Sequence, residues 1–388
     1  MPTGLKGPAL TTMNGAPAVS QAVSARVNLL GLPALELQSL VGSLGSRPFR
    51  ARQLMNWLYK RGVAEIGQMS DLAKDFRSQL AQVAEVKLPE IVLAQQSLDG
   101  TRKWLLRADA SQAFEMVYIP EAARGTLCIS SQVGCVLDCS FCATARQGFN
   151  RNLTTAEIIG QVWLANRELG FEPGGERRIT NVVFMGMGEP LANFRHVVPA
   201  TQILLDDLGF DYSRRRVTLS TSGLVPQIYK LAEVCNVALA VSLHAPDDEL
   251  RDQLVPINRL HPISELLEAC WHYIDEQNGR SVTFEYVMLA GVNDSAAQAR
   301  ALGRLLAGHP AKVNMIPFNP FPGTQYRRSD DETIWRFRDE LLKRNVMATV
   351  RRTRGEDIDA ACGQLVGRVQ NRTVARIGER ARSAQAAP

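Results

Sequence analysis

Six short apolar segments, each followed by a stretch with helical spacing of its apolar residues, fill most of the chain after residue 124. These predicted strands are 125–132, 179–188, 215–223, 237–245, 281–290 and 311–319. Strands that alternate with helices form parallel sheets, because each crossover helix returns the chain to the same edge. A closed eight-fold barrel would need two more units. The alternation therefore predicts an α/β fold with a partial (β/α)6 TIM-like barrel.

The rest of the chain divides by composition around this barrel. Ala, Gly, Pro, Ser and Thr dominate the first residues without periodicity, whereas short helical segments with scattered basic residues follow. The predicted parts are a disordered tail over 1–27, a helical N-terminal, helix-hairpin-helix-like RNA-binding domain over 28–88, a β-hairpin linker over 89–122, the barrel over 123–347, a C-terminal strand and loop over 348–370, and a basic tail over 371–388.

Bulk composition limits the class of protein. No stretch approaches the roughly 18 continuous apolar residues of a membrane span, and the N-terminus has no apolar signal segment. We therefore expect a cytoplasmic protein without a membrane partner, in which the seven cysteines stay reduced. A net charge of +5 is compatible with a nucleic-acid partner.

Three of these cysteines, Cys135, Cys139 and Cys142, are spaced C-x3-C-x2-C directly after the first predicted strand. In such folds the chemistry lies at the carboxyl ends of the strands. A structural zinc site would normally add a fourth Cys or His, whereas an iron–sulfur cluster accepts a non-protein ligand at one iron. The motif favours a cluster, with a zinc site completed by Cys128 as the alternative.

The motif, with Phe141 before its last cysteine and its place after the first strand, resembles the radical S-adenosylmethionine (SAM) superfamily. The resemblance implies that the three cysteines bind one [4Fe–4S] cluster and that SAM completes the open iron. It also gives the segment MGMGEP and the other strand ends a role in SAM binding. The implied SAM-binding residues are Gly188, Glu189, Ser220, Ser242, Leu243, His244 and Asn319.

Two further cysteines stand apart from Cys235 and Cys270, which lie in apolar segments and read as buried hydrophobic residues. Cys128 lies on the first predicted strand. Cys362 lies in a polar loop after the last strand, where a thiol is a candidate nucleophile.

Longer sequence segments narrow the resemblance from the superfamily to one family. The segments FEMVYIPE, TLCISSQVGCVLDCSFCATARQGFNRNL, VVFMGMGEPL, VSLHAP, NPFPG and RGEDIDAACGQL are similar, in order, to the RlmN family of RNA adenine-C2 methyltransferases, and the similarity spans residues 28–370. It implies that Cys362 becomes S-methylcysteine with one SAM. A radical generated from a second SAM then activates that methyl group for addition to adenine C2. Cys128 releases the product and forms a disulfide with Cys362, and Glu115 is the proton acceptor.

The family also implies partners. Its RNAs are 23S ribosomal RNA, at an adenosine near the peptidyl-transferase centre, and tRNA, at the adenosine 3′ of the anticodon. We expect a monomer that receives electrons from a donor such as flavodoxin or ferredoxin. Two alternatives remain: a C8-adenosine methyltransferase of the Cfr type, which shares all five site cysteines, and a zinc-containing RNA-binding protein without catalysis.

Overall fold

A ten-stranded sheet organises the computed structural model, which describes residues 26–277 and 281–368. Its strands run in the order β14-β13-β12-β11-β10-β9-β6-β5-β4-β3, so β14 and β3 form the two edges. The neighbours from β6 to β14 are all parallel. These parallel strands are β6 (Arg124–Cys128), β9 (Asn181–Phe184), β10 (Val217–Thr221), β11 (Ala238–Ser242), β12 (Val282–Met288), β13 (Ala311–Pro317) and β14 (Met347–Val350). The predicted partial barrel of six strand–helix units is confirmed.

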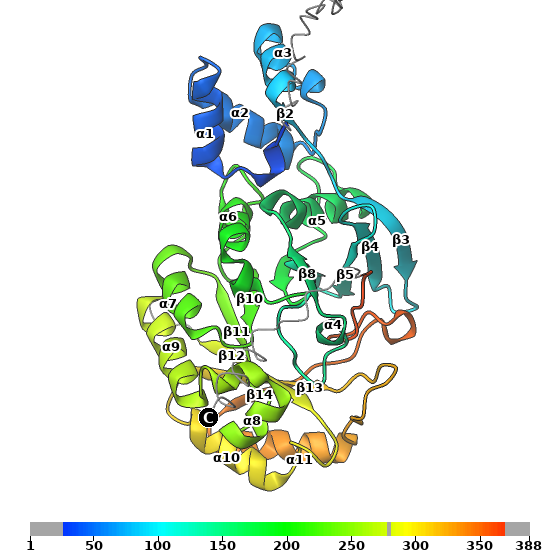
Figure 1. Cartoon of the computed structure of the whole chain (residues 1–388), viewed down its shortest axis with the longest axis vertical. Helices are drawn as coiled ribbons and strands as arrows, with labels where there is room; N and C mark the ends of the chain where they lie inside the picture. The colour runs from blue at the N-terminus through cyan, green and yellow to red at the C-terminus, as the bar shows by residue number, and fades with distance from the viewer. Residues whose placement is uncertain (1–25, 278–280, 369–388) are drawn as a thin grey trace, which may run out of the picture.

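Helices return the chain between the parallel strands and lie outside the curved sheet (Figure 1). They are α5 (Thr155–Glu168), α6 (Phe194–Leu205), α7 (Val225–Val234), α8 (Asp248–Leu254), α9 (Ile263–Glu276), α10 (Ala296–Leu306) and α11 (Asp331–Leu342). Side-chain caps fix where several of them begin. Thr154 and Glu157 form a reciprocal capping box at α5, as Ser295 and Gln298 do at α10.

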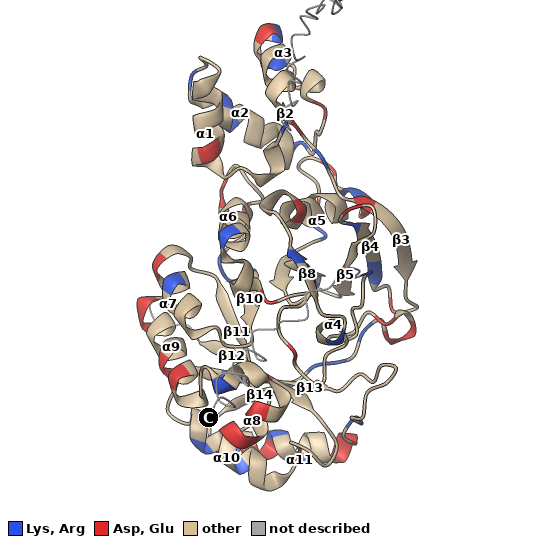
Figure 2. Ribbon diagram, in the orientation of Figure 1, with Lys and Arg blue, Asp and Glu red and all other residues tan. Residues whose placement is uncertain are grey.

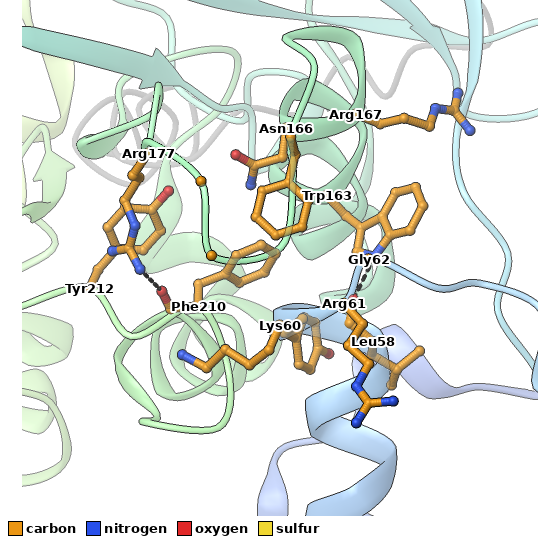
Figure 3. Close-up of a pocket in the computed structure, with 14 residues that line it drawn as sticks. Leu58, Lys60, Arg61, Gly62, Trp163, Asn166, Arg167, Arg177, Phe210 and Tyr212 are labelled. Carbon is orange, nitrogen blue, oxygen red and sulfur yellow. Dashed lines mark hydrogen bonds between the residues drawn. The ribbon is translucent and has the colours of Figure 1, made fainter. Parts of the chain in front are cut away.

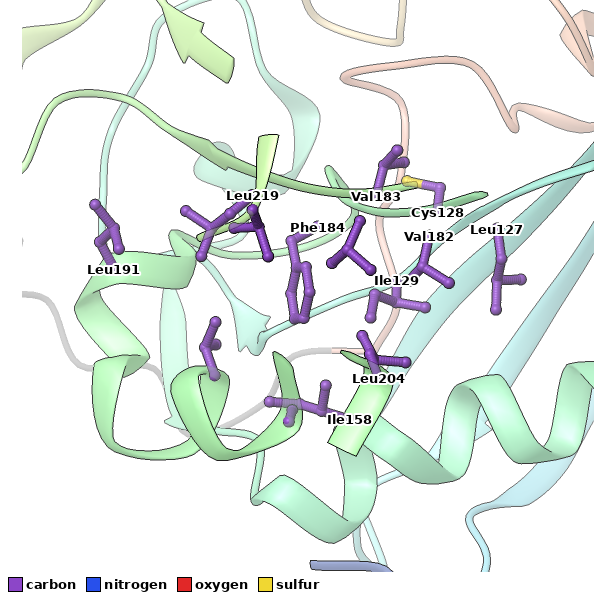
Figure 4. Packing of buried hydrophobic residues seen from close by; sticks show 14 of the residues in the cluster. Leu127, Cys128, Ile129, Ile158, Val182, Val183, Phe184, Leu191, Leu204 and Leu219 are labelled. Carbon is purple, nitrogen blue, oxygen red and sulfur yellow. The ribbon is translucent and has the colours of Figure 1, made fainter. Parts of the chain in front are cut away.

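The core lies between the sheet and this helical layer. Figure 4 shows Val182, Phe184 and Leu219 of β9 and β10 packed near Ile158 of α5 and Leu204 of α6, and all five are buried. Burial alternates along β10, where Val217 and Leu219 are buried and Thr218 lines an interior cavity, so the apolar side chains of this strand lie on one face. This packing fixes where the carboxyl ends of the strands lie.

Residues 89–122, predicted as a β-hairpin linker, form three antiparallel strands that continue the main sheet. These are β3 (Glu90–Gln96), β4 (Arg102–Arg107) and β5 (Ala113–Glu121). β5 pairs with β6, and this pairing sets Val117 opposite Cys128. The extension is therefore rigidly joined to the first strand of the barrel.

The N-terminal part is helical. Its elements are β1 (Val27–Asn28), α1 (Ala34–Ser43), α2 (Phe49–Met55), a π-helical turn (Asn56–Lys60), α3 (Lys74–Val83) and β2 (Ala84–Glu85). The last two residues of the predicted tail 1–27 contact this part, since Arg26 pairs with Glu85 at 2.7 Å and Val27 pairs with Ala84. Residues 1–25 of that tail and the predicted basic tail 371–388 lie outside the described residues.

The N-terminal helices rest on the helical layer of the barrel around a cavity of about 320 Å³ (Figure 3). The Trp163 indole N–H donates to the Leu58 carbonyl at 2.9 Å. The rings of Tyr59 and Phe210 lie 5.0 Å apart. These contacts tie the two parts together, and the domain boundaries given above stay predictions.

Figure 2 shows Lys and Arg residues interspersed with Asp and Glu residues in both parts of the chain. Within residues 26–277 and 281–368, none of the helices has the length and apolar character needed to cross a membrane.

A short hairpin and helix complete the first unit. They are β7 (Gln132–Gly134), α4 (Ala143–Arg146) and β8 (Phe149–Asn152), and β7 pairs with β8.

Candidate active site

The loop between β7 and α4 carries Cys135, Cys139 and Cys142, all half-buried. The loop begins at a position that requires glycine. Gly134 has a φ of +77°, and a Cβ there would lie 1.9 Å from the Gly148 carbonyl oxygen. The Cys135 N–H donates to the same carbonyl at 2.9 Å. This turn fixes how the loop leaves β7, and further along the loop the Cys139 sulfur lies 4.0 Å from the Ser222 hydroxyl, directly after β10.

The chemistry of the three thiols fits a cluster of positive iron ions. Burial, and next the neighbouring Cys139 and Cys142, raise the pKa of the Cys135 thiol well above its usual value. Burial and Cys142 likewise raise the pKa of Cys139 to about 12. Thiolates that repel one another in a desolvated loop need cationic ligands to stay ionised.

A single zinc ion fits less well. In the part of the chain that the structure describes, no three His, Cys, Asp or Glu side chains are grouped as the ligands of one metal ion would be. A [4Fe–4S] cluster differs because three of its irons take one thiolate each and the fourth accepts a non-protein ligand. Cys128, the fourth ligand that the zinc alternative requires, lies in a different cavity from Cys142.

A cavity of about 160 Å³ joins the strand ends to the cysteine loop. Seven residues singled out in the sequence line it: Cys142, Gly188, Glu189, Ser220, Ser242, His244 and Cys362. They come from distant segments, brought together because the carboxyl ends of parallel strands share one edge.

Glu189 is buried in this cavity wall. Its carboxylate accepts hydrogen bonds from the Leu191 N–H at 3.0 Å and the Ser222 N–H at 2.8 Å. Burial raises its pKa to about 7, against the opposing effect of these hydrogen bonds. Gly188 has a φ of +99°, and a Cβ would lie 2.5 Å from the Gln132 Cβ, so no side chain fits beside the carboxylate.

His244 is held as a neutral ring. Its Nδ1 accepts a hydrogen bond from the Val287 N–H at 3.0 Å, which leaves the proton on Nε2. Burial, and next the nearby Arg251, lower its pKa to about 3. The ring of Phe141 meets it edge-on at 4.6 Å. The imidazole therefore lines the cavity as an uncharged ring whose orientation is fixed.

A second, narrow cavity holds both outlying cysteines, Cys128 and Cys362, together with Asn319 and Arg351. Burial, and next the neighbouring Cys362, raise the pKa of Cys128 to about 12, so this thiol is protonated at neutral pH. Both thiols are free, without the disulfide expected between them. Cys362 and Arg351 also line the first cavity, which makes the two cavities neighbours.

Four predicted residues lie outside the lining of both cavities: Cys135 and Cys139 of the cysteine loop, Leu243 and Glu115. Leu243 is fully buried, and its carbonyl accepts a hydrogen bond from Arg251. Glu115 is buried on β5, where it pairs with Lys103 at 3.4 Å and accepts a hydrogen bond from the Val366 N–H at 3.0 Å. Its role as proton acceptor stays a prediction.

Sequence reasoning missed Arg251 on α8, which is fully buried beneath the strand ends. Its guanidinium donates to the Ser222 carbonyl at 2.7 Å, the Ser242 carbonyl at 3.1 Å and the Asn258 side chain at 2.7 Å. In sequence it lies in DELRDQL, which reads as a solvated helix face. No local signal distinguishes it.

Glu285 of β12 was missed as well. It lines the first cavity beside Arg351, and burial raises its pKa to about 7. Its native pKa exceeds the usual value, so the native state binds more protons than the unfolded state between pH 4.5 and 7, and stability falls as the pH rises through this window.

Glu285→Gln removes that titration. We expect the variant to gain about 1–3 kcal/mol over the parent protein as the pH rises from 5 to 8. Thermal unfolding of both proteins at the two pH values measures the difference. An identical difference at both values would contradict the buried, proton-binding carboxyl.

Comparisons with known proteins agree with this site. Residues 27–86 match the family described as Ribosomal RNA large subunit methyltransferase N-terminal domain, and residues 129–301 match the Radical SAM superfamily. A radical SAM methyltransferase from Sphaerobacter thermophilus is 44% identical, with a TM-score of 0.81 over 87% of this chain and 99% of that chain. SuiB from Streptococcus suis, bound to S-adenosylmethionine, is 14% identical, with a TM-score of 0.43 over 60% of this chain and 54% of its own. The chain therefore belongs to the RlmN-type radical SAM methyltransferase family.

Proposed function

We propose that this chain methylates C2 of adenosine in 23S ribosomal RNA, at the peptidyl-transferase centre, and in tRNA, 3′ of the anticodon. One observation carries the proposal. Cys362 lines the cavity that Cys142 also lines, and it lines the adjoining cavity together with Cys128. A radical SAM site needs only its three cluster cysteines, so two more thiols beside it indicate a protein-bound carrier of the carbon being transferred.

The radical SAM family implies a [4Fe–4S] cluster and SAM, which supply one-electron chemistry when bound. Cys135, Cys139 and Cys142 would hold the cluster. Gly188 and Glu189 would receive the SAM ammonium group, since both line the cavity, Glu189 with a carboxylate that can accept hydrogen bonds and Gly188 without a side chain. For the rest of SAM we propose Ser220, Ser242, Leu243, His244 and Asn319.

Cys362 is the proposed methyl carrier. Its sulfur attacks the methyl carbon of SAM, so that a C–S bond forms to Cys362 while the bond to the SAM sulfur breaks and S-adenosylhomocysteine leaves; the thiol proton goes to solvent. Joining the carbon to adenine C2 requires loss of the C2 hydrogen, as a proton to the proposed acceptor Glu115 and an electron that the cluster would take up. The Cys128 sulfur then attacks the Cys362 sulfur. The electron pair of the broken C–S bond stays on carbon, which takes a proton, and a disulfide forms that an external two-electron donor reduces.

The proposal extends to the proton acceptor, the electron donor and the RNA partner. Glu115 is the proposed proton acceptor, and flavodoxin or ferredoxin the class of electron donor. We propose two SAM molecules per turnover, a monomer and a cytoplasmic location. The matched N-terminal segment, residues 27–86, supports an RNA partner because its family is described by ribosomal RNA methylation.

Product mapping tests the proposal. The protein, with its cluster assembled anaerobically, is incubated with SAM, a reductant and either tRNA or a 23S RNA fragment, and the nucleosides are identified by mass spectrometry against standards. We expect 2-methyladenosine at one position in each RNA. A methyl group at C8 would assign the chain to the Cfr type instead. A colourless protein that holds zinc without iron would support the RNA-binding alternative.

A further inference from the structure

The loop that carries Cys362 is tied to β5 close to the cysteine itself. The Glu115 carboxylate accepts a hydrogen bond from the Val366 N–H, four residues after Cys362, at 3.0 Å. Ala113 and Arg368 exchange two backbone hydrogen bonds of 2.9 Å each. The far side of the loop is thus fixed to the antiparallel extension of the sheet.

Lys103 of β4 ties the near side. Its ammonium group lies 3.4 Å from the Glu115 carboxylate and donates to the Asp359 carbonyl at 3.2 Å, three residues before Cys362. Both side chains of the ion pair are only 7% exposed. Asp359 has a φ of +50°, a left-handed conformation that a non-glycine residue keeps only where its surroundings hold it. One buried ion pair therefore contacts the loop on both sides of Cys362.

Two further carboxylates join the Cys362 loop to the turn between β3 and β4. Asp357 accepts hydrogen bonds from the Ser97 hydroxyl and from the Leu98 N–H at 3.2 Å. Asp99 accepts one from the Gly355 N–H at 3.1 Å. All these contacts join residues about 250 positions apart.

The energetics of the ion pair favour a positioning role. A buried ion pair costs desolvation that its Coulomb attraction only just offsets, so it adds little stability over an apolar pair. The pair does fix the positions of its neighbours, because the polar atoms of Lys103 and Glu115 that do not contact each other still need hydrogen-bond partners. Here the Asp359 carbonyl and the Val366 N–H are these partners, and both belong to the Cys362 loop.

We propose that Lys103 is a positioning residue that, together with Glu115, holds the loop so that Cys362 lies between the two cavities. The inference rests on the proposed role of Cys362 as methyl carrier. The β3–β5 extension then has the role of holding the Cys362 loop, since it supplies both members of the ion pair and the turn that contacts Asp357.

Hydrogen exchange of the cluster-loaded protein, resolved by peptide, tests the proposal. The double variant Lys103→Met with Glu115→Gln leaves no unpaired charge. We expect exchange of residues 355–367 to rise by about tenfold or more, the factor that one hydrogen bond to a charged group typically contributes. Peptides from β12 are expected to exchange as in the parent protein, whereas a merely structural role would accelerate both. Unchanged exchange in the loop would overturn the proposal.

Two further variants sharpen the test. Arg107→Met removes the exposed Glu90–Arg107 pair of the same strands, 2.7 Å long, and is expected to leave the loop unchanged. Asp357→Ala is a surface change that is expected to accelerate exchange at 355–360 even if the double variant does not fold, and no acceleration would overturn the role of the β3–β5 extension in holding the loop. Because exchange is measured without RNA, a chain that fails to methylate C2 but shows these changes would refute the proposed function and leave the positioning role standing.

Discussion

Cys362→Ala is expected to abolish RNA methylation, with a fall of at least about a thousandfold in the single-turnover rate. Alanine removes the sulfur that we propose as the carrier of the carbon, and Cys128, the other thiol lining the second cavity, is not expected to replace it. Cys128 is buried, and burial raises its pKa to about 12, so it is a poor nucleophile at neutral pH. The rate of methyl transfer to tRNA by the anaerobically loaded protein measures the effect. Iron content and colour are expected to be unchanged, because Cys362 lies outside the cysteine loop.

Two matched cysteine variants show whether the effect belongs to position 362. Cys270→Ala changes a fully buried thiol of α9 that lines neither cavity, and its rate is expected to stay near that of the parent protein. Cys128→Ala is expected to leave the protein joined to RNA, because the sulfur proposed to release the product is gone. A Cys362→Ala rate within tenfold of the parent rate would exclude the carrier role. Cys128→Ala without a stable protein–RNA adduct would exclude only the releasing role.

The barrel and the meeting of its strand ends could be predicted because both depend on local pattern. Runs such as 237–245 identify buried parallel strands, and the crossover rule then places the carboxyl ends of all of them on one edge. Cys142, Glu189 and His244 could therefore be assigned to one site, although more than 45 residues separate any two of them.

Other features could not be predicted because they depend on partners far away in the sequence. The alternating pattern of 89–122 indicates strands but not the strand with which β5 pairs, and pairing with β6 makes the supposed linker part of the sheet. The same holds for Glu115, whose contact with Val366 spans 251 positions. A charged residue in an amphipathic segment most often faces water, so the burial of Arg251 contradicts the local pattern.

Arg251→Met is expected to lower the free energy of unfolding by roughly 3–5 kcal/mol. The guanidinium lies beneath the ends of β10 and β11, where it donates to the carbonyls of Ser222, Ser242 and Leu243. Burial lowers its pKa to about 10, which still leaves it charged at neutral pH. Methionine fills a similar volume but leaves these buried acceptors without a donor, and each unsatisfied acceptor costs about 1–3 kcal/mol.

Urea-induced unfolding measures this loss, with Arg304→Met on the exposed face of α10 as the control, for which we expect a change within about 0.5 kcal/mol. The effect should extend to the cavity, because Ser222 accepts from Arg251 through its carbonyl and donates to Glu189 through its N–H. We therefore expect SAM binding to weaken in Arg251→Met under conditions where the variant is folded. Arg251→Lys is expected to restore little, because a single ammonium group cannot reproduce the planar fork that reaches carbonyls of two strands at once. An unfolding free energy equal to that of the Arg304→Met control would show that the strand ends are held by the sheet alone.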